Sequence, residues 1–102
     1  MSEETVKIGK WDVPKALLNE YIKYRVLADD YTSKNPKVTR KGLMIDYEIS
    51  LRWQACVQRV MEIHREICKV VNVPYSEEPE NEFYKVFIIE TDKRVRRLRE
   101  GG

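Results

Sequence analysis

One stretch of the chain, LRWQACVQRVMEIHREICKVV at residues 51–71, limits the possible folds more than any other part of the sequence. Its apolar side chains recur at steps of three and four residues, which is the spacing of one face of an α-helix. Ser50 stands where a helix cap is expected. We therefore predict a long amphipathic helix that must bury one face against another element. The apolar stripe consists of Trp53, Val57, Val60, His64, Ile67 and Val71.

A similar pattern predicts an earlier helix in WDVPKALLNEYIKYRVLADDYTS at residues 11–33. Asp12 can cap this helix, and Pro14 is tolerated in its first turn. The segments KNPKVTRKG and NVPYSEEPEN, which follow the two helices, carry turn residues and are predicted loops. The apolar face of the earlier helix consists of Leu17, Tyr21, Tyr24, Ala28 and Tyr31.

Two further segments have the composition of strands. LMIDYEIS at residues 43–50 alternates between apolar and polar side chains, which is typical of a half-buried strand. EFYKVFIIE at residues 82–90 is apolar on both faces, as expected for a central strand. TVKIG at residues 5–9 could add an edge strand. KRVRRLRE at residues 93–100 could pair as a strand after a turn at TDK, or form a short helix capped by Thr91 or Asp92.

The order helix, strand, helix, strand suggests an internal duplication. A shift of 40 residues superposes residues 12–50 on residues 52–90 without a gap, and most core positions then agree in size and polarity. Chance agreement between two amphipathic segments is the competing interpretation. We expect one α+β domain over residues 1–102, with two long helices packed on a small sheet and a basic tail at residues 93–102.

Composition excludes several classes of protein. Apolar residues make up 42% and charged residues 35% of the chain, which is a globular composition rather than a disordered one. The net charge is only +2, so no global field draws the protein to nucleic acid or to a membrane. No apolar run is long enough to span a bilayer, and the first residues do not resemble a signal peptide. We therefore expect a cytoplasmic protein without membrane contact.

The residues that carry chemistry do not form a recognisable catalytic or metal-binding pattern. Cys56 and Cys68 would lie about 18 Å apart on one helix, too far for a disulfide. His64 and Cys68 have the spacing of half a metal site, but no other residue supplies the second half. Asp46 and Glu48 could share a strand face, as carboxylates on sheet surfaces routinely do. We expect no enzyme activity, no cofactor and no bound metal.

Aromatic side chains favour a binding protein instead. Tyr and Trp are the residues that most often anchor interfaces, and this chain has six Tyr and two Trp. A groove between two helix–strand units could take an extended peptide, and the protein would be a monomer or a homodimer. The residues predicted to bind a protein or peptide partner are Tyr24, Tyr31, Tyr47, Tyr84 and Trp53.

Charge is distributed unevenly along the chain. The loop at residues 34–41 is basic, whereas its counterpart carries Glu77, Glu78, Glu80 and Glu82, which suits a partner with its own charge polarity or head-to-tail self-association. The alternative function is weak binding of nucleic acid through this loop and the tail at residues 93–99. The basic patch consists of Lys34, Lys37, Arg40, Lys41, Lys93, Arg94, Arg96 and Arg97.

Two resemblances follow from these features. RLREGG at the end resembles the tail of ubiquitin-like modifiers, although Glu100 interrupts the match and the predicted order of elements differs. The length, the abundance of Lys and Glu over Gln, and the pair LMIDYEIS and EFYKVFIIE together resemble small orphan proteins of filamentous viruses of hyperthermophilic archaea, such as the Acidianus filamentous viruses. That resemblance implies an intracellular viral protein without known enzymology that works through protein partners. It implies no functional residues.

Overall fold

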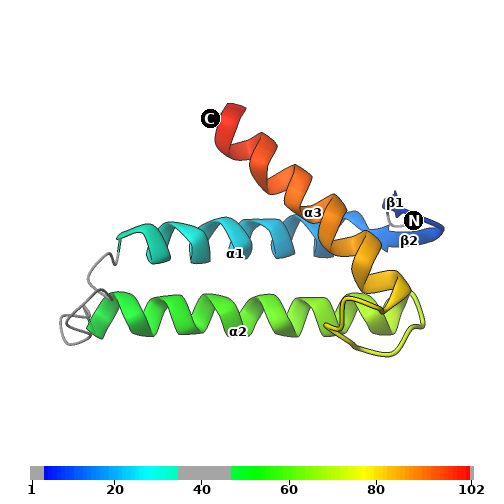
Figure 1. Cartoon of the computed structure of the whole chain (residues 1–102), viewed down its shortest axis with the longest axis horizontal. Helices are drawn as coiled ribbons and strands as arrows, with labels where there is room; N and C mark the ends of the chain where they lie inside the picture. Colours follow the sequence, from blue (N-terminus) through cyan, green and yellow to red (C-terminus); the bar gives the residue numbers. More distant parts are fainter. Residues whose placement is uncertain (1–3, 35–46, 102) are drawn as a thin grey trace.

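The computed structural model describes residues 4–34 and 47–101 as a mixed α+β fold. Two short strands, β1 (Thr5–Ile8) and β2 (Trp11–Pro14), precede three helices, α1 (Lys15–Lys34), α2 (Tyr47–Val70) and α3 (Glu82–Gly101). Figure 1 shows α1 and α2 side by side and antiparallel, with the strands at one end of the pair and α3 rising across α1. The body measures 48 × 30 × 23 Å, so it is elongated along the helix pair.

The strands form a two-stranded antiparallel hairpin. Ile8 pairs with Trp11 across a two-residue turn, and Gly9 in that turn has a φ of 61°, a conformation that side chains with a Cβ disfavour. The edge strand expected at residues 5–9 is confirmed as β1. Asp12 does not cap a helix, because it belongs to β2 and its carboxylate lies 3.6 Å from the Lys7 ammonium. The predicted helix start at residue 11 is therefore wrong, and α1 begins at Lys15.

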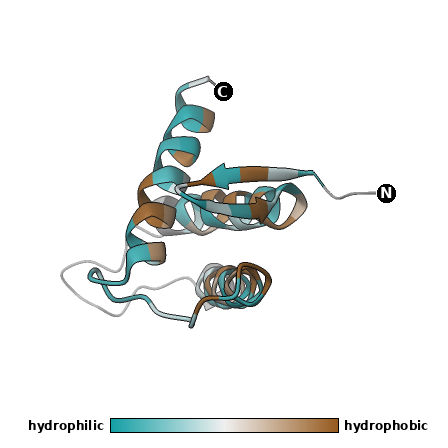
Figure 2. Cartoon of the chain, turned by 90° about the vertical axis from the view of Figure 1, so that its right-hand side faces the viewer, coloured by the Kyte–Doolittle hydropathy of each residue, from teal (hydrophilic) through white to brown (hydrophobic). Residues whose placement is uncertain are grey.

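The core lies where the hairpin, the helix pair and the first half of α3 meet. Each element contributes buried apolar side chains to this core. For α1 and α2, the periodicity of the sequence predicted such an apolar face. Figure 2 shows apolar segments facing one another between the helices, while the end of α3 is largely hydrophilic. Cys56 and Cys68 are buried free thiols on one helix, as predicted. The buried core cluster is Ile8, Val13, Leu18, Tyr21, Ile22, Ile63, Ile67, Cys68, Phe83, Phe87 and Val95.

Helix α3 overturns the prediction of a strand at residues 82–90. The Asn81 side-chain oxygen accepts the Tyr84 backbone N–H at 2.8 Å, which caps the helix in the usual way. The buried positions along α3 recur every four residues, the period of a helix face: Phe83, Phe87, Thr91 and Val95. Of the two alternatives for residues 93–100, the structure has the helix, but it is the continuation of α3 and does not begin at a cap on Thr91 or Asp92. The Thr91 hydroxyl instead donates to the Phe87 carbonyl within the helix.

The internal duplication of a helix–strand unit is not confirmed. Residues 43–46 of the first predicted strand lie outside the described residues, and residues 47–50 form the first turn of α2. The second predicted strand is helical, so residues 52–90 contain two helices rather than a helix and a strand. The packing of two long helices on a small sheet is not confirmed either, because α1 and α2 pack chiefly on each other and β2 contacts only part of each. The single-domain interpretation of residues 1–102 stays a prediction.

Candidate functional site

The candidate site lies where α3 crosses α1, and ion pairs hold the two helices together there. An Arg25 guanidinium nitrogen lies 2.8 Å from an Asp92 carboxylate oxygen, and the Arg25 side chain is only 24% exposed. Near the end of α3, Arg99 lies 3.2 Å from Asp30 and 3.8 Å from Asp29. The acidic pair at the end of α1 therefore has a structural role, because it positions the last turn of α3.

A groove of about 370 Å³ opens between the two helices beside these ion pairs. Its apolar part comes from Ile22, which is 5% exposed, and from Leu98, which is 58% exposed. The remaining lining residues are polar or cationic: Asn19, Lys23, Arg94 and Arg97. A second hollow of about 300 Å³ shares Asn19 and extends the concave surface along α1 towards the hairpin.

The cations of the groove differ in whether they already have a partner. The Arg94 Nε lies 3.7 Å from a Glu90 carboxylate oxygen and has no hydrogen-bond partner among residues 4–34 and 47–101. Within the described residues, neither Lys23 nor Arg97 makes an ion pair. An apolar floor with unpaired cations on its rim is suited to a ligand that carries both an apolar group and negative charge.

The five aromatic residues predicted to bind a partner do not come together. Tyr24 and Tyr31 are half-buried on α1, and Trp53 is 39% exposed on the outer part of α2. Tyr47 begins α2, and its side chain lies outside the described residues. Tyr84 is half-buried on α3 beside His64, eleven residues and about 16 Å along α2 from Trp53. A groove shared by these rings is therefore not seen, and a binding role for each stays a prediction.

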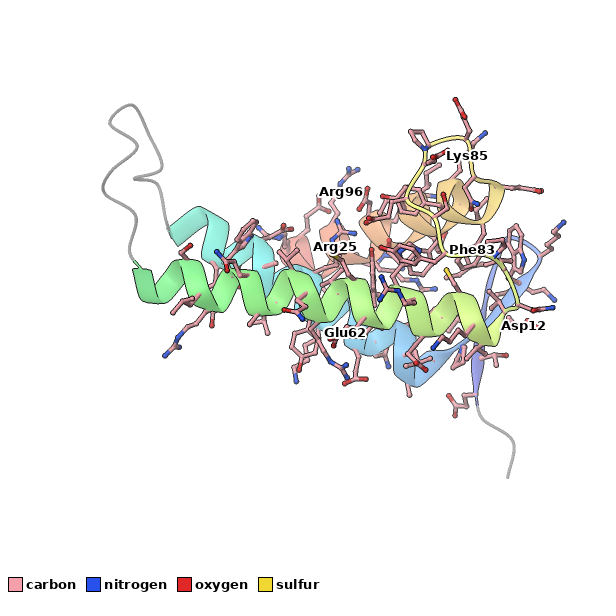
Figure 3. The ribbon with its side chains drawn as sticks, turned by 90° about the horizontal axis from the view of Figure 1, so that it is seen from below. Asp12, Arg25, Glu62, Phe83, Lys85 and Arg96 are labelled. Carbon is pink, nitrogen blue, oxygen red and sulfur yellow. The ribbon has the colours of Figure 1, made fainter. Side chains whose placement is uncertain are left out.

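The predicted basic patch is also divided. Lys37, Arg40 and Lys41 lie outside the described residues, as does the side chain of Lys34 at the end of α1. The four remaining cations lie on α3, where Arg94 and Arg97 line the groove while Lys93 and Arg96 are exposed elsewhere. Figure 3 shows the Arg96 side chain pointing away from α2 into solvent.

His64 lies in an aromatic cluster at the junction of α2, the following loop and α3. Its ring is 2% exposed and stacks on Phe87 with centroids 5.2 Å apart, and its centroid is 4.8 Å from that of Tyr75. The His64 Nε2 is buried, and none of the residues that the structure describes gives it a hydrogen-bond partner. Burial lowers the pKa of His64 from its ordinary 6.5, and the Glu77 carboxylate opposes that shift. The neutral ring therefore acts as part of the core.

Sequence reasoning missed the α1 side of the groove and Leu98. Asn19 and Lys23 carry no motif, and they become neighbours of the tail only because α3 crosses α1. A signal for Leu98 did exist, because Val95 and Leu98 stand three residues apart in the basic tail, as on one helix face. Treating the tail as the continuation of the preceding apolar segment would have revealed it.

Comparisons with protein-family models, with curated proteins and with solved structures found no match. Across residues 4–34 and 47–101, no group of three or more His, Cys, Asp or Glu side chains is arranged to hold a metal ion. In the same part of the chain, no helix has the length and apolarity needed to cross a membrane. The resemblance to archaeal viral proteins and the cytoplasmic location stay predictions.

Proposed function

We propose that this protein is a protein-interaction module, without enzymatic activity, that binds an acidic, partly apolar segment of a partner in the groove between α1 and α3. An apolar side chain of the partner packs between Ile22 and Leu98. Carboxylates beside it pair with Lys23 and Arg97. The observation that carries the proposal is the groove itself, in which the exposed Leu98 lies among cations of which Lys23 and Arg97 make no ion pair in the described part of the chain.

The chemistry of the groove favours a peptide over a small molecule. Ile22 and Leu98 offer apolar surface for one side chain of a ligand, and the polar and cationic residues around them can meet the backbone and carboxylates of an extended peptide. Exposed ion pairs contribute little affinity each, so the apolar contact at Leu98 supplies most of the binding free energy and the cations supply specificity.

Nucleic-acid binding is the second candidate, because Lys93, Arg96 and Arg97 are exposed on α3. Carboxylates interrupt this surface, since Glu90 and Asp92 lie on the same helix and Asp29 pairs with Arg99. A phosphate backbone would meet these carboxylates together with the cations. The acidic peptide is therefore the better fit.

The test uses three fluorescent probes. One is a synthetic peptide with leucine on one face and glutamate on the other, one is its lysine counterpart, and one is duplex DNA. We expect the full chain to bind the glutamate peptide, and Leu98→Asp to weaken that binding at least about tenfold because the apolar contact is lost. Arg97→Glu should weaken it about three- to tenfold. The matched control is Lys69→Glu, a charge reversal on the exposed side of α2, which should leave binding unchanged.

Two outcomes would contradict the proposal. Equal binding of the glutamate and lysine peptides would mean that the cations do not select the ligand. DNA binding that falls steeply with salt, together with no binding of either peptide, would favour the nucleic-acid function instead.

A further inference from the structure

The His64 ring is enclosed by α1, by α3 and by the α2–α3 loop, residues 71–81, and these parts differ in how deeply they are buried. Tyr21 of α1 and Phe87 of α3, whose rings contact that of His64, are at most 3% exposed. On the loop side, the Tyr75 ring lies 4.8 Å from that of His64, centroid to centroid, and Tyr75 is only half-buried. Because residues 77–80 beyond it are exposed, the loop is the thinnest side of the enclosure.

The α2–α3 loop is attached to the helices by a turn and by three half-buried side chains. At the end of α2, the Val73 N–H donates to the Cys68 carbonyl at 2.9 Å, and Asn72 has a φ of 62°, as residues that end helices often do. Val71, Val73 and Tyr75 are the partly buried apolar side chains of the loop that pack against the core. A segment with so little buried surface opens at a smaller free energy than the helices that it covers.

The enclosure suits a neutral imidazole but not an imidazolium. The His64 ring is 2% exposed, and its Nε2 has no acceptor or donor beside it among the described residues. Protonation makes both ring nitrogens donors and adds a positive charge, which is unfavourable in a buried place without an acceptor. If the loop lifts, water reaches the ring and supplies that acceptor. Proton uptake by His64 and opening of the loop are therefore coupled.

We propose that the α2–α3 loop is an acid-sensitive cover over His64: when the ring takes up a proton, residues 73–80 lift away while α1, α2 and α3 stay packed. Phe83, Phe87 and Val95 keep α3 on the helix pair, because they are buried at positions that do not depend on the loop. The switch is independent of the groove proposed above, since the described residues that line the groove lie on α1 and on the second half of α3.

Other ionisable groups set how strongly the ring responds to acid. The Glu77 carboxylate favours the charged ring and so opposes opening, but burial outweighs it and lowers the pKa of His64. Beyond Tyr21, the charge of Arg25 is balanced by Asp92 at 2.8 Å. The titratable and charged groups that lie around the His64 ring or around Tyr75 are Tyr21 of α1, Arg65 and Cys68 of α2, Tyr75 and Glu77 of the loop, and Tyr84 of α3.

Hydrogen exchange of the full chain, followed by NMR, tests this switch. The protection factor of the Val73 N–H reports on the loop, and that of the Ile22 N–H, in the buried middle of α1, reports on the helices. From about pH 7.5 to about pH 5, we expect the Val73 protection factor to fall about five- to thirtyfold, with the upper value if the enclosed ring takes up no proton. Val73 should also stay less protected than Ile22 and respond little to low urea concentrations, because lifting the loop exposes little surface.

Three variants assign the response to His64. His64→Phe should hold the Val73 protection factor within about twofold over the same pH range, because the titrating ring is gone. Glu77→Gln should make the fall at least as large as in the wild-type chain, since the carboxylate that favours the charged ring is removed. The matched control is Glu78→Gln, a change at the next, exposed residue of the loop, which should leave the fall unchanged.

Three results would overturn the proposal. If Val73 and Ile22 lose protection together and with the same dependence on urea, then acid unfolds the whole chain and the loop does not open by itself. An equal fall in the wild-type chain and in His64→Phe would mean that another group takes up the proton. A smaller fall in Glu77→Gln than in Glu78→Gln would contradict the opposing role of Glu77 and with it the coupling between the ring and the loop.

Discussion

The two halves of α3 differ in what surrounds them, although one continuous helix contains both. The first half is bound into the core through Phe83, Phe87 and Thr91, which are at most 3% exposed. Beyond Val95, residues 96–101 are all exposed, and Arg99 is what ties that segment to α1. A helix that is anchored at one end can present the side chains of its other end in fixed positions. The difference therefore separates residues that stabilise the fold from residues that are free to bind.

The largest effect should come from Phe87→Ala in the first half. Phe87 is fully buried and its ring contacts those of Tyr21, His64 and Phe83. We expect the free energy of unfolding to fall by about 3–5 kcal/mol, because the change removes buried apolar surface and leaves a cavity. Urea unfolding measures this. The matched control is Ile89→Ala on the exposed side of the helix, where the change should be within about 0.5 kcal/mol. Similar losses for both variants would contradict the comparison.

The ion pairs of the two halves should differ by a smaller amount. A double-mutant cycle on Arg25 and Asp92 should give a coupling energy of about 1 kcal/mol, because the pair is short and the arginine is largely buried. The same cycle on Arg99 and Asp30, which are about half exposed, should give about 0.5 kcal/mol or less. Alanine variants in urea unfolding measure both. A larger coupling for Arg99 would mean that the second half is the better anchored one.

The contact of α3 with His64 should make stability depend on pH. Burial holds the pKa of His64 below its ordinary 6.5, so the unfolded chain takes up a proton more readily than the folded protein. The contribution of the neutral His64 ring to the free energy of unfolding is therefore complete above about pH 6.5. It is lost as the pH falls through the lower pKa that His64 has in the folded protein. The titratable groups that interact with the ring are Tyr21, Tyr75, Tyr84 and Glu77.

His64→Phe tests this dependence. The variant should reduce the loss of unfolding free energy between neutral and mildly acidic pH, because the titrating ring is gone. At neutral pH it should be at least as stable, since it also removes a buried nitrogen without a partner. Thermal unfolding at several pH values measures both quantities. If the variant loses as much unfolding free energy between neutral and mildly acidic pH as the wild-type chain does, then other groups cause that loss.

The smallest effect should come from the second half. Arg96→Glu changes an exposed residue that has no ion pair among the described residues, so the free energy of unfolding should stay within about 0.5 kcal/mol of the wild-type value. Circular dichroism and urea unfolding measure this. A larger loss would place Arg96 among the residues that hold the fold.

Only part of the candidate site is predictable from the sequence. The sequence predicts the cations of the tail and the opposite charge of the loop at residues 77–82. It does not predict the groove, because Lys23 and Leu98 are far apart along the chain and meet only when α3 crosses α1. The aromatic residues were overvalued for a related reason: Tyr21, Tyr75 and Tyr84 surround His64 inside the protein. Composition counts rings, but it does not say which of them are buried.

The sequence by itself determined the two helices of the antiparallel pair. Their apolar residues recur with a period of 3.6, and only an α-helix gathers such residues on one face that can be buried. It also indicated a possible strand at β1, which is followed by Gly9 in a left-handed turn conformation. Only the tertiary structure decided the state of residues 82–90. Local propensity favours a strand in so apolar a segment. As a helix, the segment places Phe83 against Trp11 of β2 and Phe87 against Tyr21 of α1 and His64 of α2, while the Asn81 cap satisfies its first turn. Burial shared with distant elements outweighs local preference, and the groove exists only as its consequence.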